Sequence, residues 1–239
     1  METLSKLKVK IFADGADKSG MLEMYEKPYI KGLTTNPTLM RKAGISDYEA
    51  FARDVLQAIP DRPISFEVLS DDFEEMEIQA LKIARWGENV YVKIPVTNTK
   101  GESSVKVVRN LAEAGVKVNV TAMTTLSQVQ EIGSKALADG PPSYISVFAG
   151  RIADTGCDPV PIMATAVEMC SVYPNIELIW ASPRELLNIF QADAIGCHII
   201  TVTNDILKKL SLVGKDLNEF SLDTVNMFFN DAVKAGYSL

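Results

Sequence analysis

The chain has 239 residues, of which 47% are hydrophobic and 23% charged, so it is long enough to bury a sizeable globular core. Its formal net charge of −7 argues against nucleic acid or an anionic membrane surface as the main partner. No stretch approaches the ~18 uninterrupted apolar residues of a membrane span, and the first ten residues lack the apolar segment of a signal peptide, so we expect a cytoplasmic protein.

Eight short apolar runs alternate with segments whose apolar residues recur at helical spacing, a pattern typical of parallel strands and their crossover helices. The predicted strands are 9–14, 32–36, 64–69, 90–96, 116–122, 144–149, 176–182 and 197–202. The predicted helices are 48–59, 72–86, 102–114, 125–138, 159–172, 183–192, 204–213 and 223–235. We expect Ser46 to cap the first helix, with Glu49 completing a capping box, and Asp71 or Asp72 to begin the second.

Strict alternation of this kind implies parallel strands joined by right-handed crossovers. Eight such units close most simply into an α/β fold of the (β/α)8 barrel type. We predict a single barrel domain over residues 1–239, with an additional C-terminal helix from about residue 216. Val225, Met227, Phe228 and Phe229 in that helix need cover from the barrel or from a neighbouring subunit. A doubly wound open sheet is the alternative, but the ADGAD segment after the first strand is not the glycine-rich phosphate loop of that fold.

Polar side chains recur in the later halves of the predicted strands. They are Asp14, Asn36, Glu67, Lys93, Asn119, Thr121, Ser146 and Ser182. In a (β/α)8 barrel, the carboxyl ends of the strands meet at one mouth, where active sites lie. Because side chains alternate along a strand, Asn119 and Thr121 share a face, as do Ser146 and Phe148. The interior is the one place where all these polar groups can meet.

Lys93 lies in the middle of the run NVYVKIPVT. A lysine buried there has to be desolvated or paired, and a neutral amine is a nucleophile that can form a Schiff base with a ketone or aldehyde. The alternative is a lysine that extends to solvent or belongs to a structural ion pair. Closure of the ring would bring Asp14 and Glu67 within reach of Lys93. An amine with two proton carriers is what an imine-forming aldolase requires.

Two arginines follow adjacent predicted strands, Arg151 in VFAGRI and Arg184 in WASPRE. Guanidinium groups match phosphate oxygens with paired hydrogen bonds, so we expect a phosphate site, with separate surface arginines as the alternative. Three cysteines without close pairing and one histidine do not favour a zinc site, and we expect no metal. The apolar run around His198 favours a histidine satisfied within a strand rather than a catalytic one.

Seven motifs together resemble the transaldolase family in order and spacing, from Phe12 to Glu185. They are FADGAD, GLTTNPT, ISFEV, YVKIPVT, NVTAM, ISVFAGRI and ASPRE, of which GLTTNP and VKIPVT are the specific ones. The resemblance implies a class I aldolase barrel without a cofactor, its Schiff-base lysine on the fourth strand, and sugar phosphate substrates. It also implies a homo-oligomer, since members of the compact subfamily often form pentamers or decamers.

The resemblance further implies a role for each matching residue. Lys93 would form the imine with the C2 carbonyl of a ketose. Asp14 would exchange the proton of the C4 hydroxyl, and Glu67 would act through a water held by Thr121. The remaining site residues would bind the sugar or its phosphate: Thr34, Asn36, Asn119, Ser146, Phe148 and Ser182 for the sugar, Arg151 and Arg184 for the phosphate.

The expected reaction is transfer of a dihydroxyacetone unit from fructose 6-phosphate or sedoheptulose 7-phosphate to an aldose phosphate, in the pentose phosphate pathway. Glu67 and Phe148 stand where fructose 6-phosphate aldolases of the family typically carry glutamine and tyrosine, and so favour transaldolase. Gly15 replaces the usual threonine or serine, and Met123 is a second departure. The alternatives are an aldolase that releases free dihydroxyacetone and a non-catalytic barrel that binds sugar phosphates.

Overall fold

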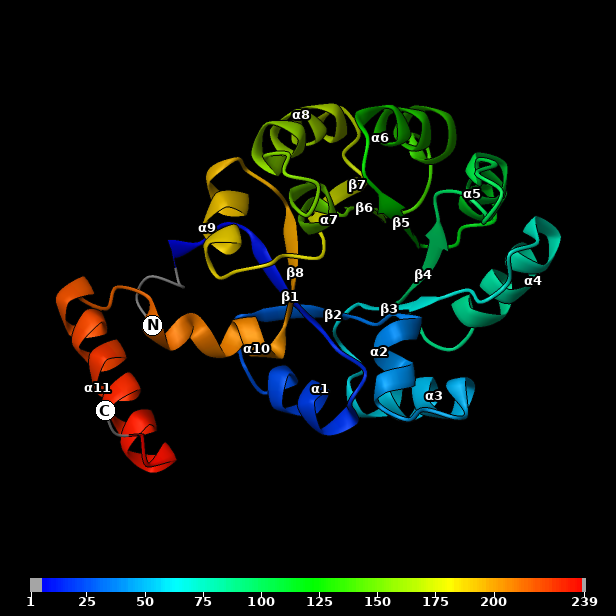
Figure 1. The fold of residues 1–239 in the computed structure, drawn as a ribbon. Coiled ribbons are helices and arrows are strands. Elements are labelled where there is room, and N and C mark those ends of the chain that lie inside the picture. The colour runs from blue at the N-terminus through cyan, green and yellow to red at the C-terminus, as the bar shows by residue number, and fades with distance from the viewer. Residues whose placement is uncertain (1–5, 238–239) are drawn as a thin grey trace. The chain divides into compact units, whose positions relative to one another are not determined.

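The computed structural model describes residues 6–237, and its eight strands form a closed parallel barrel (Figure 1). The strands are β1 (Lys10–Asp14), β2 (Ile30–Thr34), β3 (Ile64–Glu67), β4 (Val90–Pro95), β5 (Val118–Met123), β6 (Ser143–Val147), β7 (Ile176–Trp180) and β8 (Ile199–Thr203). β8 pairs with β1, with Lys10 opposite Ile199 and Asp14 opposite Thr203, which closes the ring. The predicted (β/α)8 barrel is therefore confirmed, and the open sheet is excluded.

Helices lie between and after the strands, and those before Lys208 surround the ring of strands (Figure 1). They are α1 (Lys18–Tyr25), α2 (Pro37–Lys42), α3 (Tyr48–Ala58), α4 (Phe73–Ala84), α5 (Val105–Glu113), α6 (Leu126–Ile132), α7 (Ala149–Ala153), α8 (Pro159–Ser171), α9 (Leu187–Ala194), α10 (Asn204–Leu207) and α11 (Leu217–Ala235). A π-helical turn, η2 (Gly133–Leu137), follows α6, and a 3-10 turn, η3 (Lys208–Leu212), follows α10. Apolar spacing predicts none of α1, α2 and α7, because helices of 8, 6 and 5 residues are too short to show a helical period.

The predicted capping box of α3 is wrong. Asp47 caps the helix in place of Ser46, since its Oδ1 accepts a hydrogen bond from the backbone N of Ala50 at 3.0 Å. The helix thus begins one residue later than a Ser46 cap requires, and the Glu49 carboxylate bonds to Arg53 and Lys82. The cap of α4 is Asp72, one of the two predicted residues, which accepts from the backbone N of Glu75 at 3.0 Å.

An aromatic and aliphatic cluster fills part of the barrel interior. It consists of Phe12, Tyr144, Ile179, Ala181 and Ile199, with Tyr91 and Phe148 packed against it. Tyr91 stacks on Tyr144 with ring centroids 4.0 Å apart, and Phe12 meets Tyr144 edge to face at 5.8 Å. Gly32 makes room for this packing, because a Cβ there would lie 2.5 Å from the Phe12 ring. The polar strand-end residues lie toward the carboxyl ends of the same strands.

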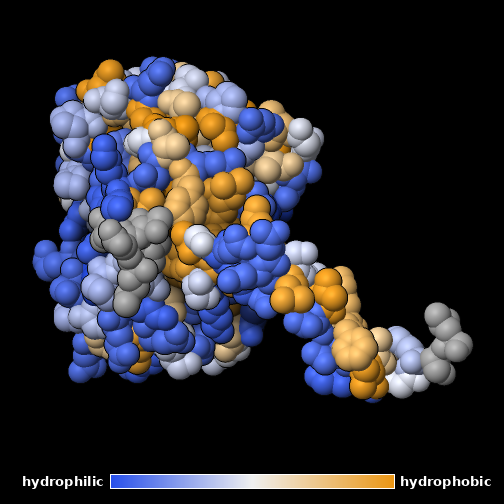
Figure 2. All heavy atoms as spheres, turned by 90° about the vertical axis from the view of Figure 1, so that its left-hand side faces the viewer, coloured by the Kyte–Doolittle hydropathy of each residue, from blue (hydrophilic) through white to orange (hydrophobic). Residues whose placement is uncertain are grey.

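The chain divides into two compact units, the barrel up to Leu207 and a second unit from Lys208 onward. The second unit contains η3 and α11, and Asp216 caps α11 by accepting from the backbone N of Asn218 and Glu219. Its surface carries hydrophobic residues among hydrophilic ones (Figure 2). The predicted C-terminal helix is present as α11, which begins at Leu217, before the range 223–235 that apolar spacing predicts. Across residues 6–237, no helix has the length and apolar character needed to cross a membrane.

Candidate active site

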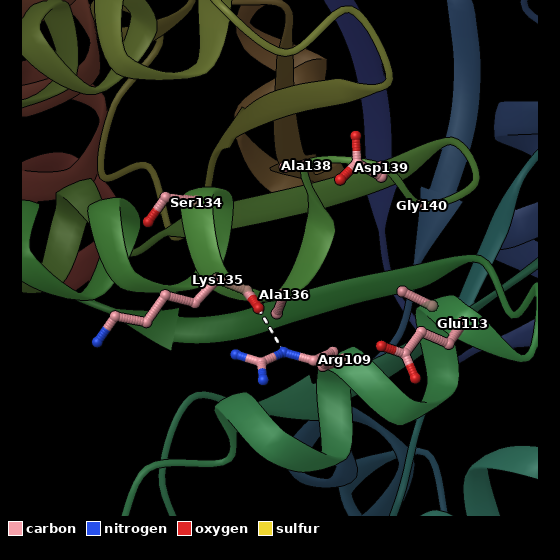
Figure 3. A pocket seen from close by; sticks show the side chains of 9 residues that line it. Arg109, Glu113, Ser134, Lys135, Ala136, Ala138, Asp139 and Gly140 are labelled. Carbon is pink, nitrogen blue, oxygen red and sulfur yellow. Dashed lines mark hydrogen bonds between the residues drawn. The ribbon is translucent and has the colours of Figure 1, made fainter.

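A cavity of about 540 Å³ opens at the carboxyl ends of the barrel strands. Every site residue that the sequence predicts lines it: Asp14, Thr34, Asn36, Glu67, Lys93, Asn119, Thr121, Ser146, Phe148, Arg151, Ser182 and Arg184. A smaller hollow of about 230 Å³ lies between α5 and η2, where Nε of Arg109 donates to the carbonyl O of Lys135 at 2.6 Å (Figure 3). Because no strand-end residue lines that hollow, the larger cavity is the candidate active site.

The amine of Lys93 ends inside the barrel. Lys93 is 6% exposed, and its Nζ donates to the carbonyl O of Thr35 at 2.8 Å. The same Nζ lies 3.5 Å from Oε2 of Glu67, which is a long distance for an ion pair that includes a buried lysine. A lysine extending to bulk solvent is therefore excluded. The amine lies in a confined space with a carboxylate beside it, which is the arrangement that imine chemistry needs.

Asp14 ends β1 as a partly buried residue. Its Oδ1 accepts from Oγ1 of Thr34 at 2.7 Å, and Oγ1 of Thr34 lies 2.5 Å from Oγ1 of Thr201. Burial raises the pKa of the Asp14 carboxyl, while the charge of Lys93 and the Thr34 hydrogen bond oppose that rise only in part. A carboxyl group with a raised pKa is suited to exchange a proton with a substrate hydroxyl.

Tyr48 on α3 fixes the backbone at Glu67. Its hydroxyl accepts from the backbone N of Glu67 at 2.7 Å and donates to the carbonyl O of Glu67 at 2.8 Å. Burial raises the pKa of the Tyr48 hydroxyl, so this group remains a proton donor. These two bonds hold the end of β3 while the Glu67 carboxylate contacts Lys93.

A buried polar network crosses the interior from β3 to β6. Nδ2 of Asn119 donates to Oγ of Ser65 at 3.0 Å, and Oγ of Ser146 donates to Oδ1 of Asn119 at 2.7 Å. Oγ1 of Thr121 is buried and has no hydrogen-bond partner among the described residues. An unsatisfied buried hydroxyl is costly, so it marks a place for a water or a ligand.

Two arginines line the side of the cavity formed by α7 and the loop after β7. Nε of Arg184 donates to Oδ1 of Asp154 at 2.9 Å, and Nη2 of Arg184 donates to Oδ2 of the same carboxylate. The backbone N of Arg184 and that of Glu185 donate to Oδ1 of Asn188 at 2.8 and 3.1 Å. This turn explains why α9 begins at Leu187 and not at the predicted residue 183.

The loop after β7 also packs tightly against the start of α7. Ser182 has a φ of +57°, a left-handed conformation that is uncommon outside glycine and is often found at functional sites. A Cβ on Gly150 would lie only 1.6 Å from the carbonyl O of Ser182. Gly150 is therefore required for the close approach that puts Ser182 and Arg184 at the cavity.

Several residues of the site region escape the sequence analysis: Tyr48, Ser65, Asp154 and Thr201. Thr201 and Thr203 lie two residues apart on β8, as Asn119 and Thr121 do on β5, and this shared parity at a strand end is the signal that could have indicated Thr201. His198 has a hydrogen-bond partner, since its Nδ1 accepts from the backbone N of Leu178 on β7 at 3.1 Å, but it lies just before β8 and not within a strand as predicted. Over residues 6–237, no group of three or more His, Cys, Asp or Glu side chains is placed to hold a metal ion.

The family profile and the sequence relatives agree on one family. The sequence profile of the family "Transaldolase/Fructose-6-phosphate aldolase" matches residues 11–239. A "probable transaldolase" of Streptococcus equi subsp. zooepidemicus is 34% identical over 204 residues, which are 85% of this chain and 90% of the relative. A "probable transaldolase" of Thermoanaerobacter sp. is 33% identical over 232 residues, or 97% and 100% of the two chains. Thiamine phosphate pyrophosphorylase from Pyrococcus furiosus shares the fold, with a TM-score of 0.55, 12% identity, and coverage of 82% of this chain and 86% of that one.

Proposed function

The chain belongs to the transaldolase/fructose-6-phosphate aldolase family, and on that basis we propose that it is a transaldolase that works through a Schiff base on Lys93. One observation carries the proposal: the Lys93 amine is buried beside Glu67, in the electrostatic field of Asp14, within a cavity that two arginines also line. A nucleophile, two proton carriers and two cations match the needs of imine chemistry on a sugar phosphate.

In the proposed reaction, Nζ of Lys93 attacks the C2 carbonyl of the donor ketose and forms a carbinolamine. Glu67 and a water bonded to the unpartnered Oγ1 of Thr121 carry the protons as hydroxide leaves as water, which gives the imine. Asp14 then takes the C4 hydroxyl proton while the C3–C4 bond breaks, and the electron pair moves into the imine to give an enamine. The aldose phosphate departs, and the acceptor aldehyde reverses these steps.

The other polar residues of the cavity suit the sugar chain. Oδ1 of Asn36 already caps α2 by accepting from the backbone N of Leu39 at 2.9 Å, so its Nδ2 is the group left to donate to a sugar hydroxyl. We assign hydroxyl binding also to Thr34, Asn119, Ser146 and Ser182, with Phe148 in the wall, and phosphate binding to Arg151 and Arg184. Substrates of this kind belong to the pentose phosphate pathway, and the proposal includes a cytoplasmic homo-oligomer.

A transfer assay with a matched lysine control tests the proposal. Wild-type protein is expected to convert fructose 6-phosphate and erythrose 4-phosphate into sedoheptulose 7-phosphate and glyceraldehyde 3-phosphate. Lys93→Ala is expected to lose this activity, whereas Lys135→Ala, on the outer side of the barrel, retains it. Full activity of a folded Lys93→Ala variant would contradict the proposal.

The same assay without an acceptor separates transfer from simple cleavage. A transaldolase keeps the enamine on Lys93 until an aldose phosphate arrives, so release of free dihydroxyacetone from fructose 6-phosphate should be much slower than transfer. Acceptor-independent release at a comparable rate would assign the chain to the aldolases of the family. Glu67 beside Lys93 and Phe148 in the cavity wall favour transfer, given the residues typical of those aldolases.

A further inference from the structure

We propose that Asp154 is a positioning residue for phosphate recognition, because it holds the guanidinium of Arg184 in the orientation that the substrate requires. Asp154 follows α7 as its C-terminal cap residue, three positions after Arg151. The short helix therefore supplies one cavity-lining arginine and the carboxylate that anchors the other. This inference rests on the proposed function, since it concerns the phosphate of the substrate.

The hydrogen bonds of Asp154 occupy one edge of the Arg184 guanidinium and leave another edge free. Arginine has five N–H donors, and Asp154 accepts from Nε and from one hydrogen of Nη2. Both hydrogens of Nη1 and the second hydrogen of Nη2 form the remaining fork. Within residues 6–237, Asp154 is the carboxylate that pairs with this guanidinium. A phosphate can thus bind the free fork without displacing the anchor.

Without a carboxylate partner, the two arginines of the cavity would repel one another in the empty site. Arg184 donates to Asp154, and these bonds, followed by the charges of Arg184 and Arg151, hold the pKa of Asp154 below its usual value despite slight desolvation. Asp154 therefore remains ionised at neutral pH and lies in the field of both cations. The anchor matters because Arg184 is 43% exposed, and an unrestrained arginine of that exposure has many rotamers open to it.

The backbone around Arg184 is already fixed, which leaves the side chain as its main freedom. Asn188 accepts from the backbone N of Arg184, and Gly150 allows the close approach of Ser182. Fixing the guanidinium as well converts a mobile cation into a preorganised phosphate ligand. The negative charge of Asp154 also repels an incoming phosphate, which is an opposing effect. Removal of the Asp154 carboxylate therefore raises KM if Asp154 acts by positioning Arg184, and lowers KM if Asp154 acts mainly by repelling the phosphate.

Kinetics of Asp154 variants with phosphorylated and unphosphorylated substrate test the inference. Asp154→Ala is expected to raise KM for fructose 6-phosphate about fivefold with kcat changed less than about twofold, and to leave KM for fructose, the unphosphorylated donor, unchanged. Asp154→Glu, which keeps the carboxylate, should restore part of the loss. Asp139→Ala, which removes an acidic residue from the outer hollow, serves as the control and should match the wild type.

A double-mutant cycle with Arg184→Ala identifies the group through which Asp154 acts. In the Arg184→Ala background, Asp154→Ala should cause no further rise in KM for fructose 6-phosphate. An unchanged or lower KM in Asp154→Ala alone, or an undiminished effect without Arg184, would overturn the inference. If Arg184→Ala itself leaves KM unchanged, the phosphate assignment of the proposed function fails and the inference fails with it. If Arg184→Ala raises KM and Asp154→Ala does not, the role of Asp154 is contradicted while the phosphate assignment of Arg184 stands.

Discussion

At the scale of single residues, the barrel interior contains polar side chains at positions where apolar side chains would make the fold more stable. Asp14 is a partly buried carboxyl, Lys93 a buried amine, and Thr121 a buried hydroxyl without a protein partner among the described residues. Each is destabilising unless something compensates for its lost hydration. All three lie at one mouth of the barrel, which is the pattern expected when destabilising polar residues are kept because a reaction needs them.

Asp14→Asn should make the protein more stable at neutral pH while removing its activity. Burial raises the pKa of Asp14, so the native state binds this proton more tightly than the unfolded chain does, and the stability contributed by this group falls as pH rises from the unfolded value of 3.8 through the raised value. The amide removes the ionisation and keeps an acceptor for Thr34. The gain in the free energy of unfolding, measured in urea, should therefore be larger at pH 7 than near pH 4. A loss of stability at pH 7 would contradict the assigned burial.

Residue-level prediction from the sequence succeeds where the position within a strand determines the direction of a side chain. Lys93 and Asn119 lie at parities that point inward once the strand ends converge, and both line the cavity. Tyr48 lies on a helix and Asp154 at the end of one, and neither a tyrosine within an apolar pattern nor an exposed aspartate indicates a particular role. Their contacts with Glu67 and Arg184 depend on how elements far apart in the chain meet in space.

At the scale of elements, the barrel strands are predicted to within a few residues, because buried parallel strands are distinct apolar runs. Helix ends are less predictable where more than one nearby side chain can cap the helix or bond to its first turn. Asp47 takes the cap expected of Ser46, and Asn188 holds the turn that delays α9. The helix predicted over residues 125–138 is present, but it changes to a π-helical turn at Gly133, a feature with no signal in apolar spacing.

A glycine comparison tests the packing of α7 against the loop after β7. Gly150→Ala would place a Cβ 1.6 Å from the carbonyl O of Ser182, so the backbone has to shift, and we expect a loss of about 3 kcal/mol or more in the free energy of unfolding. Gly15→Ala is the matched change, because a Cβ there meets nothing within 4 Å, and it should alter stability by less than about 1 kcal/mol. Denaturant unfolding of both variants provides the measurement. Equal stability of the two would show that the close approach is not required.

At the scale of the whole molecule, the closed barrel explains why so many residues of the site can be predicted from the sequence. Alternation of strands and helices predicts parallel strands, and closure brings their carboxyl ends to one mouth. Every strand-end residue chosen on that reasoning then lines one cavity. The choice between a closed barrel and an open sheet is not a local property. It follows from the pairing of β8 with β1, which lie far apart in the sequence.

The assembly state is a prediction of its own at this scale. The unit from Lys208 onward holds a helix of 19 residues with large apolar side chains, among them Phe220, Met227, Phe228 and Phe229. That amount of apolar surface needs cover, and with the family resemblance it favours a homo-oligomer. Light scattering coupled to size exclusion should give five or ten times the chain mass of 26.2 kDa. A mass equal to that of one chain would rule out both the pentamer and the decamer.

The central claim is that Lys93 captures the carbonyl of a sugar, and reductive trapping tests it most directly. The protein is incubated with fructose 6-phosphate and borohydride, digested, and analysed by tandem mass spectrometry. We expect one sugar-derived adduct on the peptide that contains Lys93, and none in the Lys93→Ala variant. A protein that binds fructose 6-phosphate without any trapped adduct would be the non-catalytic barrel, and an adduct that persists in Lys93→Ala would place the chemistry on another residue.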